Sequence, residues 1–311
     1  MIGPGPESQV DKFPSRERAT SQTLAPRVSA VVVVRGVRET QSQPLDLCLR
    51  SALAEPWIDD LVIVDHGGND ASVSAALRAL QADRRDVKLL SAAVDATAAS
   101  AANLGAQYAL GRWLLFLEPD VVLQRGAVAR MAAAAGGART PWIVGGRLTD
   151  TEGRERRAIR AGALNAWSAI AVAMDWTARP AAPKRRKDEA HEPQQPAPVA
   201  AVSGAFMLIP RNDFQQLGGF DEAFATEAAD LDLCLRAADA GGSILFQPEA
   251  AGVQFARPDA SKRKRAQSLA RFAAKSAKTP AQRAFAAVAA PALVTLIALK
   301  NLIAGRPPQR R

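Results

Sequence analysis

Two carboxylates that follow a short apolar run have the residue types and spacing to do chemistry. The run Trp113–Leu117 passes directly into Glu118, Pro119 and Asp120. Five successive apolar residues are typical of a strand buried on both faces, and the proline stiffens the turn that separates the two acids. Paired carboxylates at the carboxyl end of such a strand suit a hard divalent cation that shares its oxygen ligands with substrate phosphates. The alternative is an acidic strand end that is only solvated.

A third acid, Asp65, ends another apolar run in the same way. It follows Leu61–Val64 and begins the sequence Asp-His-Gly-Gly-Asn-Asp, whose glycines and short polar residues indicate a turn. Right-handed crossovers bring the carboxyl ends of parallel strands to one edge of a sheet. We therefore expect Asp65 to share a rim, and a ligand crevice, with Glu118 and Asp120. His66, in the same turn, is expected to be a solvated histidine.

Strands and helices that alternate along the chain must position these acids. Strands are expected at Val28–Val34, Leu61–Val64, Val87–Leu90, Trp113–Leu117, Trp142–Leu148, Val202–Pro210 and Ser243–Phe246, and helices at Leu45–Leu53, Ser72–Leu80, Ala96–Ala109, Gly126–Ala135 and Ala228–Ala238. Gly105 is expected to break the third helix. This alternation predicts a doubly wound α/β layer with a mainly parallel sheet. No G-x-G-x-x-G sequence follows the first strand, which argues against a dinucleotide-binding oxidoreductase.

The composition favours an anionic partner. The chain has 311 residues, enough for a large core in one or two domains, and a formal net charge of +9. Such a charge attracts nucleotide phosphates, anionic membranes or nucleic acid. Two basic runs, 184–187 and 262–265, lie in an expected mobile loop at 178–198 and in the C-terminal tail, and aromatic residues make up only 5% of the chain. No specific nucleic-acid partner is therefore expected, because that needs basic and stacking residues on one face.

The two cysteines, Cys48 and Cys234, each lie within an apolar helical pattern. They support neither a disulfide framework nor a thiolate zinc site, so we expect them to pack in the core of a protein from a reducing compartment. Residues 1–26 are polar and Pro-rich and lack the apolar segment of a signal peptide. They are expected to be a disordered lead-in to a cytoplasmic protein.

Residues 257–311 are expected to form a basic and apolar helical tail. Residues 284–299 carry no charge, and their helical length of about 24 Å falls short of the roughly 30 Å hydrocarbon core of a bilayer. Pro291 would kink this helix. Lys and Arg on both sides favour an interfacial or re-entrant helix on the inner face of a membrane. The alternative is a helix packed on the protein itself or on another subunit.

Several short motifs follow one another in a specific order and spacing over residues 28–255. They are Cys48–Ser51, Val64–Asp70, Asn103–Gly105, Leu115–Val121, Val202–Ala205, Gly218–Glu222 and Asp230–Arg236. Together they resemble the family 2 glycosyltransferases, and look closest to the rhamnosyltransferase-like bacterial subgroup. The resemblance implies the GT-A fold, here over residues 27–256.

The resemblance also implies an inverting transfer of a sugar from a nucleotide diphosphate donor, with Mg²⁺ or Mn²⁺ as cofactor. By position, Glu118 and Asp120 match the family's D-x-D and would hold the metal and the donor diphosphate. Asp65 matches the residue that contacts the nucleotide base, and Asn103 belongs to a matching motif assigned to the donor site. Asp230 matches the general base. A cation would neutralise the leaving diphosphate while this carboxylate takes the proton of the attacking hydroxyl.

Several positions depart from the family pattern. Residues 35–37, Arg-Gly-Val, replace a Thr-Tyr-Asn-like run, and Glu118 replaces the first Asp of the D-x-D. Ala229 stands where the family has a Glu before the base, although Glu227 is close by. Gln254 stands where the family has a late His, and an amide is a poorer metal ligand than imidazole.

These departures keep two hypotheses open. The first is a glycosyltransferase that moves a sugar to a hydroxyl of a glycan or lipid-linked acceptor in cell-surface polysaccharide synthesis. The second is a catalytically impaired GT-A homologue that serves as a binding or scaffold subunit of a glycan assembly complex. Residues 163–198, expected on the acceptor side, carry no readable code for the acceptor.

Overall fold

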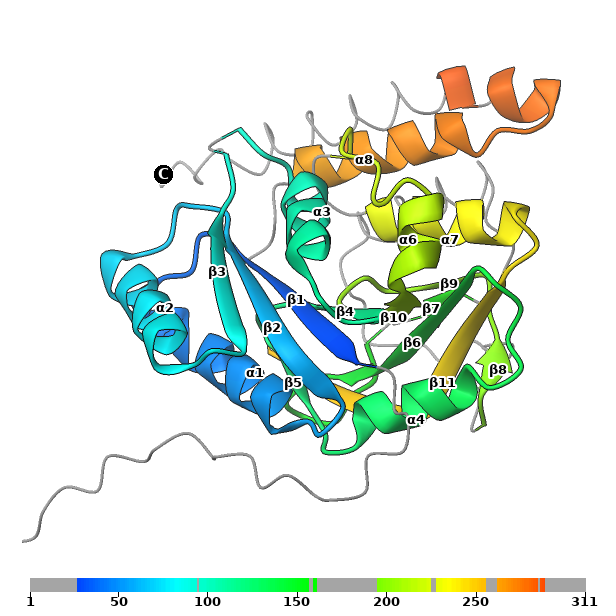
Figure 1. Cartoon of the computed structure of the whole chain (residues 1–311). Coiled ribbons are helices and arrows are strands. Elements are labelled where there is room, and N and C mark those ends of the chain that lie inside the picture. The colour runs from blue at the N-terminus through cyan, green and yellow to red at the C-terminus, as the bar shows by residue number, and fades with distance from the viewer. Residues whose placement is uncertain are drawn as a thin grey trace, which may run out of the picture.

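The computed structural model describes residues 27–93, 95–156, 159–160, 195–224, 228–255, 262–284 and 286–288 (Figure 1). The expected lead-in at 1–26, most of the expected loop at 178–198 and the tail from residue 289 lie outside this set. Within the described residues, no helix has the length and apolar character needed to cross a membrane.

A nine-stranded sheet forms the centre of the described chain, in the order β3-β2-β1-β4-β10-β6-β11-β5 with β8 paired to β11. Its strands are β1 Val28–Val34, β2 Ile58–Asp65, β3 Val87–Ser91, β4 Trp113–Leu117, β5 Val121–Leu123, β6 Trp142–Thr149, β8 Ala197–Pro198, β10 Phe206–Pro210 and β11 Ser243–Gln254. A separate pair joins β7, Ile159–Arg160, to β9, Ala201–Val202. Strands β1 and β4 have the bounds expected from their apolar runs, and both are almost wholly buried, as strands covered on two faces must be.

The strand directions bring the candidate site residues to one edge of the sheet. β1 is parallel to β2 and β4, and Val34 at its end lies opposite Asp65. β10 is antiparallel to β4 and β6, while β11 is parallel to β6 and ends with Gln254 opposite Val121 of β5. We call this edge, at which β2, β4 and β11 end, the carboxyl edge. It carries Asp65, Glu118, Asp120 and Gln254.

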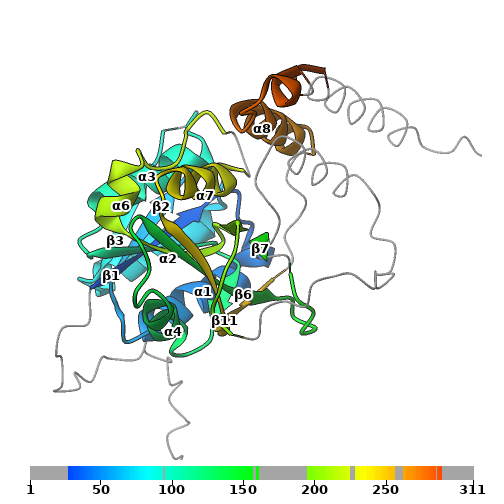
Figure 2. The same ribbon diagram turned by 90° about the vertical axis from the view of Figure 1, so that its right-hand side faces the viewer.

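Helices cover both faces of the sheet (Figures 1 and 2). α1 Ser42–Ala54, α2 Ala71–Asp83 and α4 Ala127–Ala134 pack on one face, and α3 Ala98–Tyr108, α6 Arg211–Gln216 and α7 Ala229–Asp239 pack on the other. A short 3-10 helix, η1 Glu39–Gln41, precedes α1. α8, Lys262–Lys275, packs against α7 on its side away from the sheet.

The buried side chains form two hydrophobic clusters, one for each face of the sheet. Both cysteines are buried, which confirms that they pack in the core. Burial raises the pKa of the Cys234 thiol to about 12. The cluster under α3, α6 and α7 also contains Leu269, Phe272 and Ala273 of α8. The domain limit expected at residue 256 stays a prediction, but α8 contributes to the same core as the sheet.

α3 is continuous through Gly105, so the helix break expected there is wrong. A Cβ atom at Gly105 would lie 2.5 Å from Cγ1 of Val31 and 3.1 Å from Cγ2 of Val64. The glycine therefore lets α3 lie directly on β1 and β2. Its cost in helix propensity, about 1 kcal/mol relative to alanine, is offset by this close packing and by the capping box of Thr97 and Ser100.

Candidate functional site

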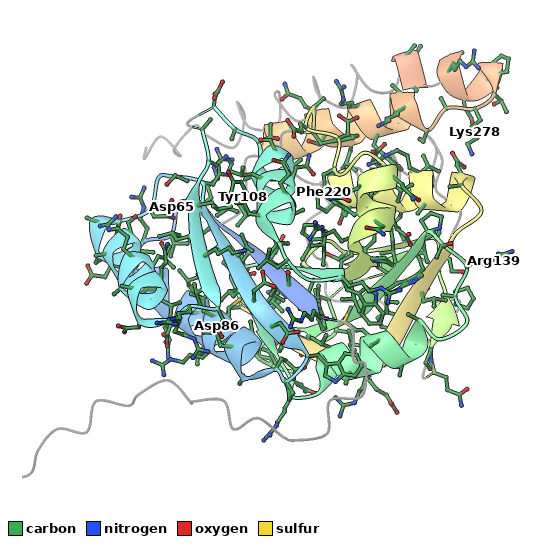
Figure 3. The ribbon with its side chains drawn as sticks, viewed as in Figure 1. Asp65, Asp86, Tyr108, Arg139, Phe220 and Lys278 are labelled. Carbon is green, nitrogen blue, oxygen red and sulfur yellow. The ribbon has the colours of Figure 1, made fainter. Side chains whose placement is uncertain are left out.

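Asp65, at the end of β2, is held by the turn that it begins (Figure 3). Its Oδ1 accepts hydrogen bonds from Gly67 N at 2.9 Å and from Asn69 Nδ2 at 2.8 Å. Its Oδ2 accepts from Ser74 Oγ at 3.3 Å. Gly67 has a φ of 78°, a left-handed conformation that favours glycine. The half-buried carboxylate thus has a fixed position at the carboxyl edge.

The turn after β1 lies against this turn. Gly36 N donates to Gly67 O at 3.1 Å, and Val37 N donates to Asn69 Oδ1 at 2.8 Å. Residues 35–37, which depart from the family pattern, therefore adjoin the turn of Asp65. Their backbone supports the same geometry that fixes its carboxylate.

His66 is buried, so the solvated histidine expected from the sequence is wrong. It is 5% exposed, and its Nε2 lies 2.6 Å from Ala96 O. Because a carbonyl oxygen only accepts, Nε2 is the donor in this contact. Nδ1 has no partner among the described residues. The ring joins the end of β2 to the loop that leads into α3, a contact with no signal in the sequence.

Gln254 brings Glu118 and Asp120 together. Its Nε2 donates to Glu118 Oε2 at 2.8 Å and lies 3.4 Å from Asp120 Oδ1. The pairing of β11 with β5 places Gln254 beside the acid turn, and Phe255 N donates to Asp120 O at 2.9 Å. Asp120 is only 5% exposed. One amide group therefore offsets the repulsion between two carboxylates that share a site.

The acid pair fits a hard divalent cation. A single atom, Nε2 of Gln254, reaches oxygens of both carboxylates, so a cation at that place would reach both as well. The described residues contain no group of three or more His, Cys, Asp or Glu side chains that could hold a metal. Mg²⁺ is commonly held by one or two carboxylates, with water and substrate phosphates as its other ligands. Rotation of the Gln254 amide would add one more oxygen ligand.

Asp230, in the first turn of α7, is fixed by two backbone N–H groups. Gly204 N donates to its Oδ2 at 2.9 Å and Leu231 N donates to its Oδ1 at 2.8 Å. The carbonyl oxygen of Ala205, the residue after Gly204, accepts a hydrogen bond from Glu118 N at 3.0 Å. Two adjacent residues before β10 thus contact the expected base on one side and the acid pair on the other.

Ala228, immediately before α7, has a left-handed φ of 83°, which no other non-glycine residue in the described ranges shares. This conformation costs an alanine about 1–2 kcal/mol. Its side chain is 1% exposed, and its carbonyl oxygen accepts from Asp232 N at 3.0 Å. Packing therefore holds a strained residue two positions before Asp230, as is common next to functional sites.

Asn103, on α3, is engaged with the turn between α6 and α7. Its Nδ2 donates to Phe220 O and to Glu222 Oε1, both at 2.9 Å, and its Oδ1 accepts from Phe220 N at 2.9 Å. A Cβ atom at Gly219 would lie 2.8 Å from that Oδ1. The donor-binding role expected for Asn103 stays a prediction, and its described hydrogen bonds position this turn.

Asp232 pairs with a residue of its own helix. It is fully buried, and its Oδ2 lies 2.8 Å from Arg236 Nε. Lys275 of α8 lies 2.7 Å from the other oxygen of Asp232 and 2.7 Å from Asp221 Oδ2. One lysine therefore joins α8 to the helix that carries Asp230 and to the turn held by Asn103.

Comparisons with known protein sequences give one consistent family. A family model described as glycosyltransferase like family 2 matches residues 26–279. The rhamnosyltransferase WbbL of Escherichia coli (strain K12) is 35% identical over 57 residues, 18% of this chain and 22% of that protein. An N-acetylglucosaminyl-diphospho-decaprenol L-rhamnosyltransferase of Mycobacterium tuberculosis is 27% identical over 144 residues, 44% of this chain and 45% of that protein. The chain thus matches less than half the length of either relative.

Solved structures show the fold. GalNAc-T7 with UDP, GalNAc and Mn²⁺ superposes with a TM-score of 0.57 at 17% identity, over 75% of this chain and 44% of that one. The mannosyltransferase PcManGT of Pyrobaculum calidifontis, in complex with GDP-Man and Mn²⁺, superposes with a TM-score of 0.56 at 16% identity, over 92% of this chain and 78% of that one. The mixed α/β layer with its central, mostly parallel sheet is therefore the GT-A fold.

Proposed function

This chain belongs to glycosyltransferase family 2, and on that premise we propose that it is an inverting, metal-dependent glycosyltransferase. The sugar would pass from a nucleotide diphosphate donor to a hydroxyl of a glycan or lipid-linked acceptor in cell-surface polysaccharide synthesis. One observation carries the proposal. Residues Gly204 and Ala205 contact Asp230 and Glu118, so the fold joins a carboxylate base to the acid pair through adjacent backbone groups.

The donor half of the reaction belongs to Asp65, Glu118 and Asp120. Asp65 would contact the nucleotide base from its fixed position, with Asn103 supporting the donor side through the turn that it holds. Glu118 and Asp120 would hold Mg²⁺ or Mn²⁺. When bound, a divalent cation offsets the charge of the leaving diphosphate.

The acceptor half of the reaction belongs to Asp230. Its two N–H donors fix the orientation of its carboxylate. As the acceptor oxygen bonds to the anomeric carbon, the bond from that carbon to the diphosphate oxygen breaks and the diphosphate leaves with the electron pair. Asp230 takes the proton of the attacking hydroxyl. Attack opposite to the departing group inverts the configuration.

A relative supports the proposal of a lipid-linked acceptor. The mycobacterial relative acts, by its name, on a decaprenol-linked N-acetylglucosaminyl diphosphate. A similar lipid-linked acceptor would place this enzyme at the inner face of a membrane, with the basic runs in its loop and tail near anionic headgroups. Attachment would be peripheral and cytoplasmic.

A second function is favoured by the contact of Gln254 with the acid pair. An amide that donates to both carboxylates suits a GT-A protein that binds a partner enzyme or a nucleotide sugar as a scaffold subunit. Ala229, in place of the glutamate that the family has before its base, points the same way. Measurements of nucleotide binding and of sugar transfer distinguish the two functions.

The first experiment is calorimetric titration of the full chain with UDP, GDP and dTDP nucleotides, with and without Mg²⁺ or Mn²⁺. We expect one nucleotide to bind only with metal, and Asp120→Asn to abolish that binding. Asp46→Asn, an exposed carboxylate on α1, is the matched control and should bind as the wild type does. No nucleotide binding by folded wild-type protein would overturn the donor site.

The second experiment uses the nucleotide found in the first. Asp230→Asn should keep donor affinity and lower kcat by about 10²–10⁴-fold, the usual contribution of a general base. Asp239→Asn, on the exposed side of the same helix, is its control. Metal-dependent binding without turnover on any acceptor in the wild type would favour the scaffold function.

A further inference from the structure

Three arginines lie side by side at the edge of the sheet opposite to the carboxyl edge. Arg27 precedes β1, Arg112 precedes β4 and Arg211 follows β10, and these strands are neighbours. Trp113 N donates to Arg27 O at 3.1 Å, and Arg211 N donates to Arg112 O at 2.9 Å. Neighbouring strands are about 4.8 Å apart, so the three arginines start from backbone positions that are close together. We call this row the arginine edge.

The arginine edge lines a cavity of about 380 Å³, within the size range of small-molecule sites. Its other lining residues are Leu110, Gly111 and Asn212, so no acid lines it. In the described part of the chain, no carboxylate pairs with any of the three arginines. The buried carboxylate of Asp60 contacts the same loop, but it accepts hydrogen bonds from Ser29 Oγ at 2.5 Å and from Leu110 N at 3.4 Å.

The cavity has a rigid wall. Nη1 of Arg211 donates to Ala109 O at 2.7 Å, which fixes this guanidinium and leaves its other N–H groups available. A Cβ atom at Gly111 would lie 2.5 Å from Ser29 N and 2.8 Å from Arg27 O, so the loop before β4 lies directly on the start of β1. Like charges at directly opposite positions of neighbouring strands are destabilising. A bound anion would remove that cost.

We propose that this cavity binds the phosphate group of a ligand that also has an apolar part. A phosphate group can accept hydrogen bonds from several guanidinium groups at once, whereas a carboxylate is already paired by one guanidinium group. The apolar part would contact Leu110, which is 67% exposed, beside Tyr108, which is 52% exposed. The site lies at the sheet edge away from Asp65 and the acid pair. It is therefore separate from the proposed donor site and independent of the proposed function.

The test is calorimetric titration of the full chain with inorganic phosphate and pyrophosphate at low ionic strength. EDTA is present throughout, so that the acid pair holds no metal. We expect wild-type protein to bind, and each of Arg27→Gln and Arg112→Gln to weaken binding about tenfold, as for a charge-assisted hydrogen bond. The double variant Arg78→Gln/Arg85→Gln removes two charges from exposed positions outside the cavity, more than either single variant, and should bind as the wild type does.

A thermal melt gives an independent measurement that also reports folding. Phosphate should raise the Tm of the wild type and of the control pair, and leave that of Arg27→Gln/Arg112→Gln unchanged. The double variant without phosphate should be no less stable than the wild type, because it removes like-charge repulsion. No phosphate binding by wild-type protein, or an equal loss in the control pair, would overturn the site.

Vesicles identify the source of the phosphate. Binding to phosphatidylglycerol vesicles but not to phosphatidylcholine vesicles, with competition by pyrophosphate and loss in Arg27→Gln/Arg112→Gln, would support the site with a lipid headgroup as ligand. Phosphate binding without vesicle binding would support it with a soluble phosphate ester. Vesicle binding that survives in the double variant, with no competition by pyrophosphate, would overturn a role of the arginine edge in lipid binding.

Discussion

The carboxylates of the candidate site differ in what holds them. Asp65 accepts from a backbone N–H group and side chains of its own turn, and Asp230 accepts from two backbone N–H groups. Glu118 and Asp120 instead share the side-chain amide of Gln254. A backbone donor is fixed by the fold, whereas an amide can rotate and present its oxygen. The acid pair is therefore the adjustable part of the site, and Gln254 is the residue that adjusts it.

This difference leads to a prediction for Gln254→His. The substitution removes an amide donor from the acid pair and adds an imidazole, which suits Mn²⁺ and Zn²⁺ better than Mg²⁺ relative to an all-oxygen set. We expect Mn²⁺ to bind about tenfold more tightly and Mg²⁺ affinity to change little, measured by calorimetry on protein without nucleotide. Gln81→His, an exposed position on α2, is the control. Equal Mn²⁺ affinity in all three proteins would show that Gln254 does not govern the metal.

Sequence reasoning found the acids but not what surrounds them. Asp65, Glu118 and Asp120 follow apolar runs, and parallel strands send such positions to one edge, so their convergence could be predicted. The sequence shows Gln254 only as a departure from a family pattern. Its contact with Glu118, 136 residues away, depends on the pairing of β11 with β5, which no local pattern indicates. The burial of His66 depends in the same way on the loop before α3.

At the scale of elements, the packing of α3 on the sheet predicts the effect of Gly105→Ala. The new Cβ atom would lie 2.5 Å from Cγ1 of Val31, so α3 or β1 must shift. Overpacking of this kind costs about 1–3 kcal/mol, of which about 1 kcal/mol is regained in helix propensity. We expect a net loss of up to about 2 kcal/mol in the free energy of unfolding, measured in urea. Gln107→Ala, on the exposed side of α3, should change it by less than about 0.5 kcal/mol; a stabilised Gly105→Ala would contradict the close contact.

The attachment of α8 predicts a pH-dependent contribution from Lys275. Its hydrogen bond to Asp221 holds the pKa of that carboxyl below its ordinary value of 3.8. A lowered carboxyl pKa adds stability that is fully present above pH 3.8 and is lost as the pH falls through the lowered value. Lys275→Met should cost about 1–3 kcal/mol at pH 7, and the part of that cost due to Asp221 should decrease as the pH falls below 3.8. Lys278→Met removes the exposed pair with Asp239 and should cost less than about 1 kcal/mol at any pH.

Urea midpoints of the wild type and both variants at pH 7, 4 and 3 measure this effect. A difference between wild type and Lys275→Met that is the same at pH 7 and pH 3 would contradict the ion pair with Asp221. Such a result would leave packing of the lysine stem as the source of the stability.

The elements themselves were predictable where burial is uniform. β1 and β4 are apolar along their whole length, so their type and bounds follow from the sequence. The antiparallel direction of β10 between β4 and β6 has no local signal, because an apolar run such as Phe206–Pro210 reads the same in either direction. The sequence predicts a helix break at Gly105, and this is wrong because the glycine allows a close contact of α3 with β1 and β2, which only the folded chain contains.

The folded domain of the whole molecule extends to α8. The tail was expected to begin at residue 257 from its change in composition. Yet Leu269, Phe272 and Ala273 of α8 are at most 1% exposed and belong to the cluster under α3, α6 and α7. Burying a leucine or phenylalanine side chain contributes about 1.5–3 kcal/mol, and burying the methyl group of an alanine contributes about 0.8 kcal/mol. These three residues together therefore contribute about 4–7 kcal/mol. This is a large share of the roughly 5–15 kcal/mol by which a domain is stable.

Two truncations decide between a tail and a core helix. We expect a chain that ends at residue 288 to keep the urea midpoint and cooperative melt of the full chain, because it retains α8. A chain that ends at residue 256 should lose about 4–7 kcal/mol of unfolding free energy and expose the apolar faces of α3 and α7, with dye binding and aggregation as further signs. Circular dichroism in urea measures both. If the shorter chain had the midpoint of the longer one, α8 would be an appendage, and the domain would end at residue 256 as the composition suggests.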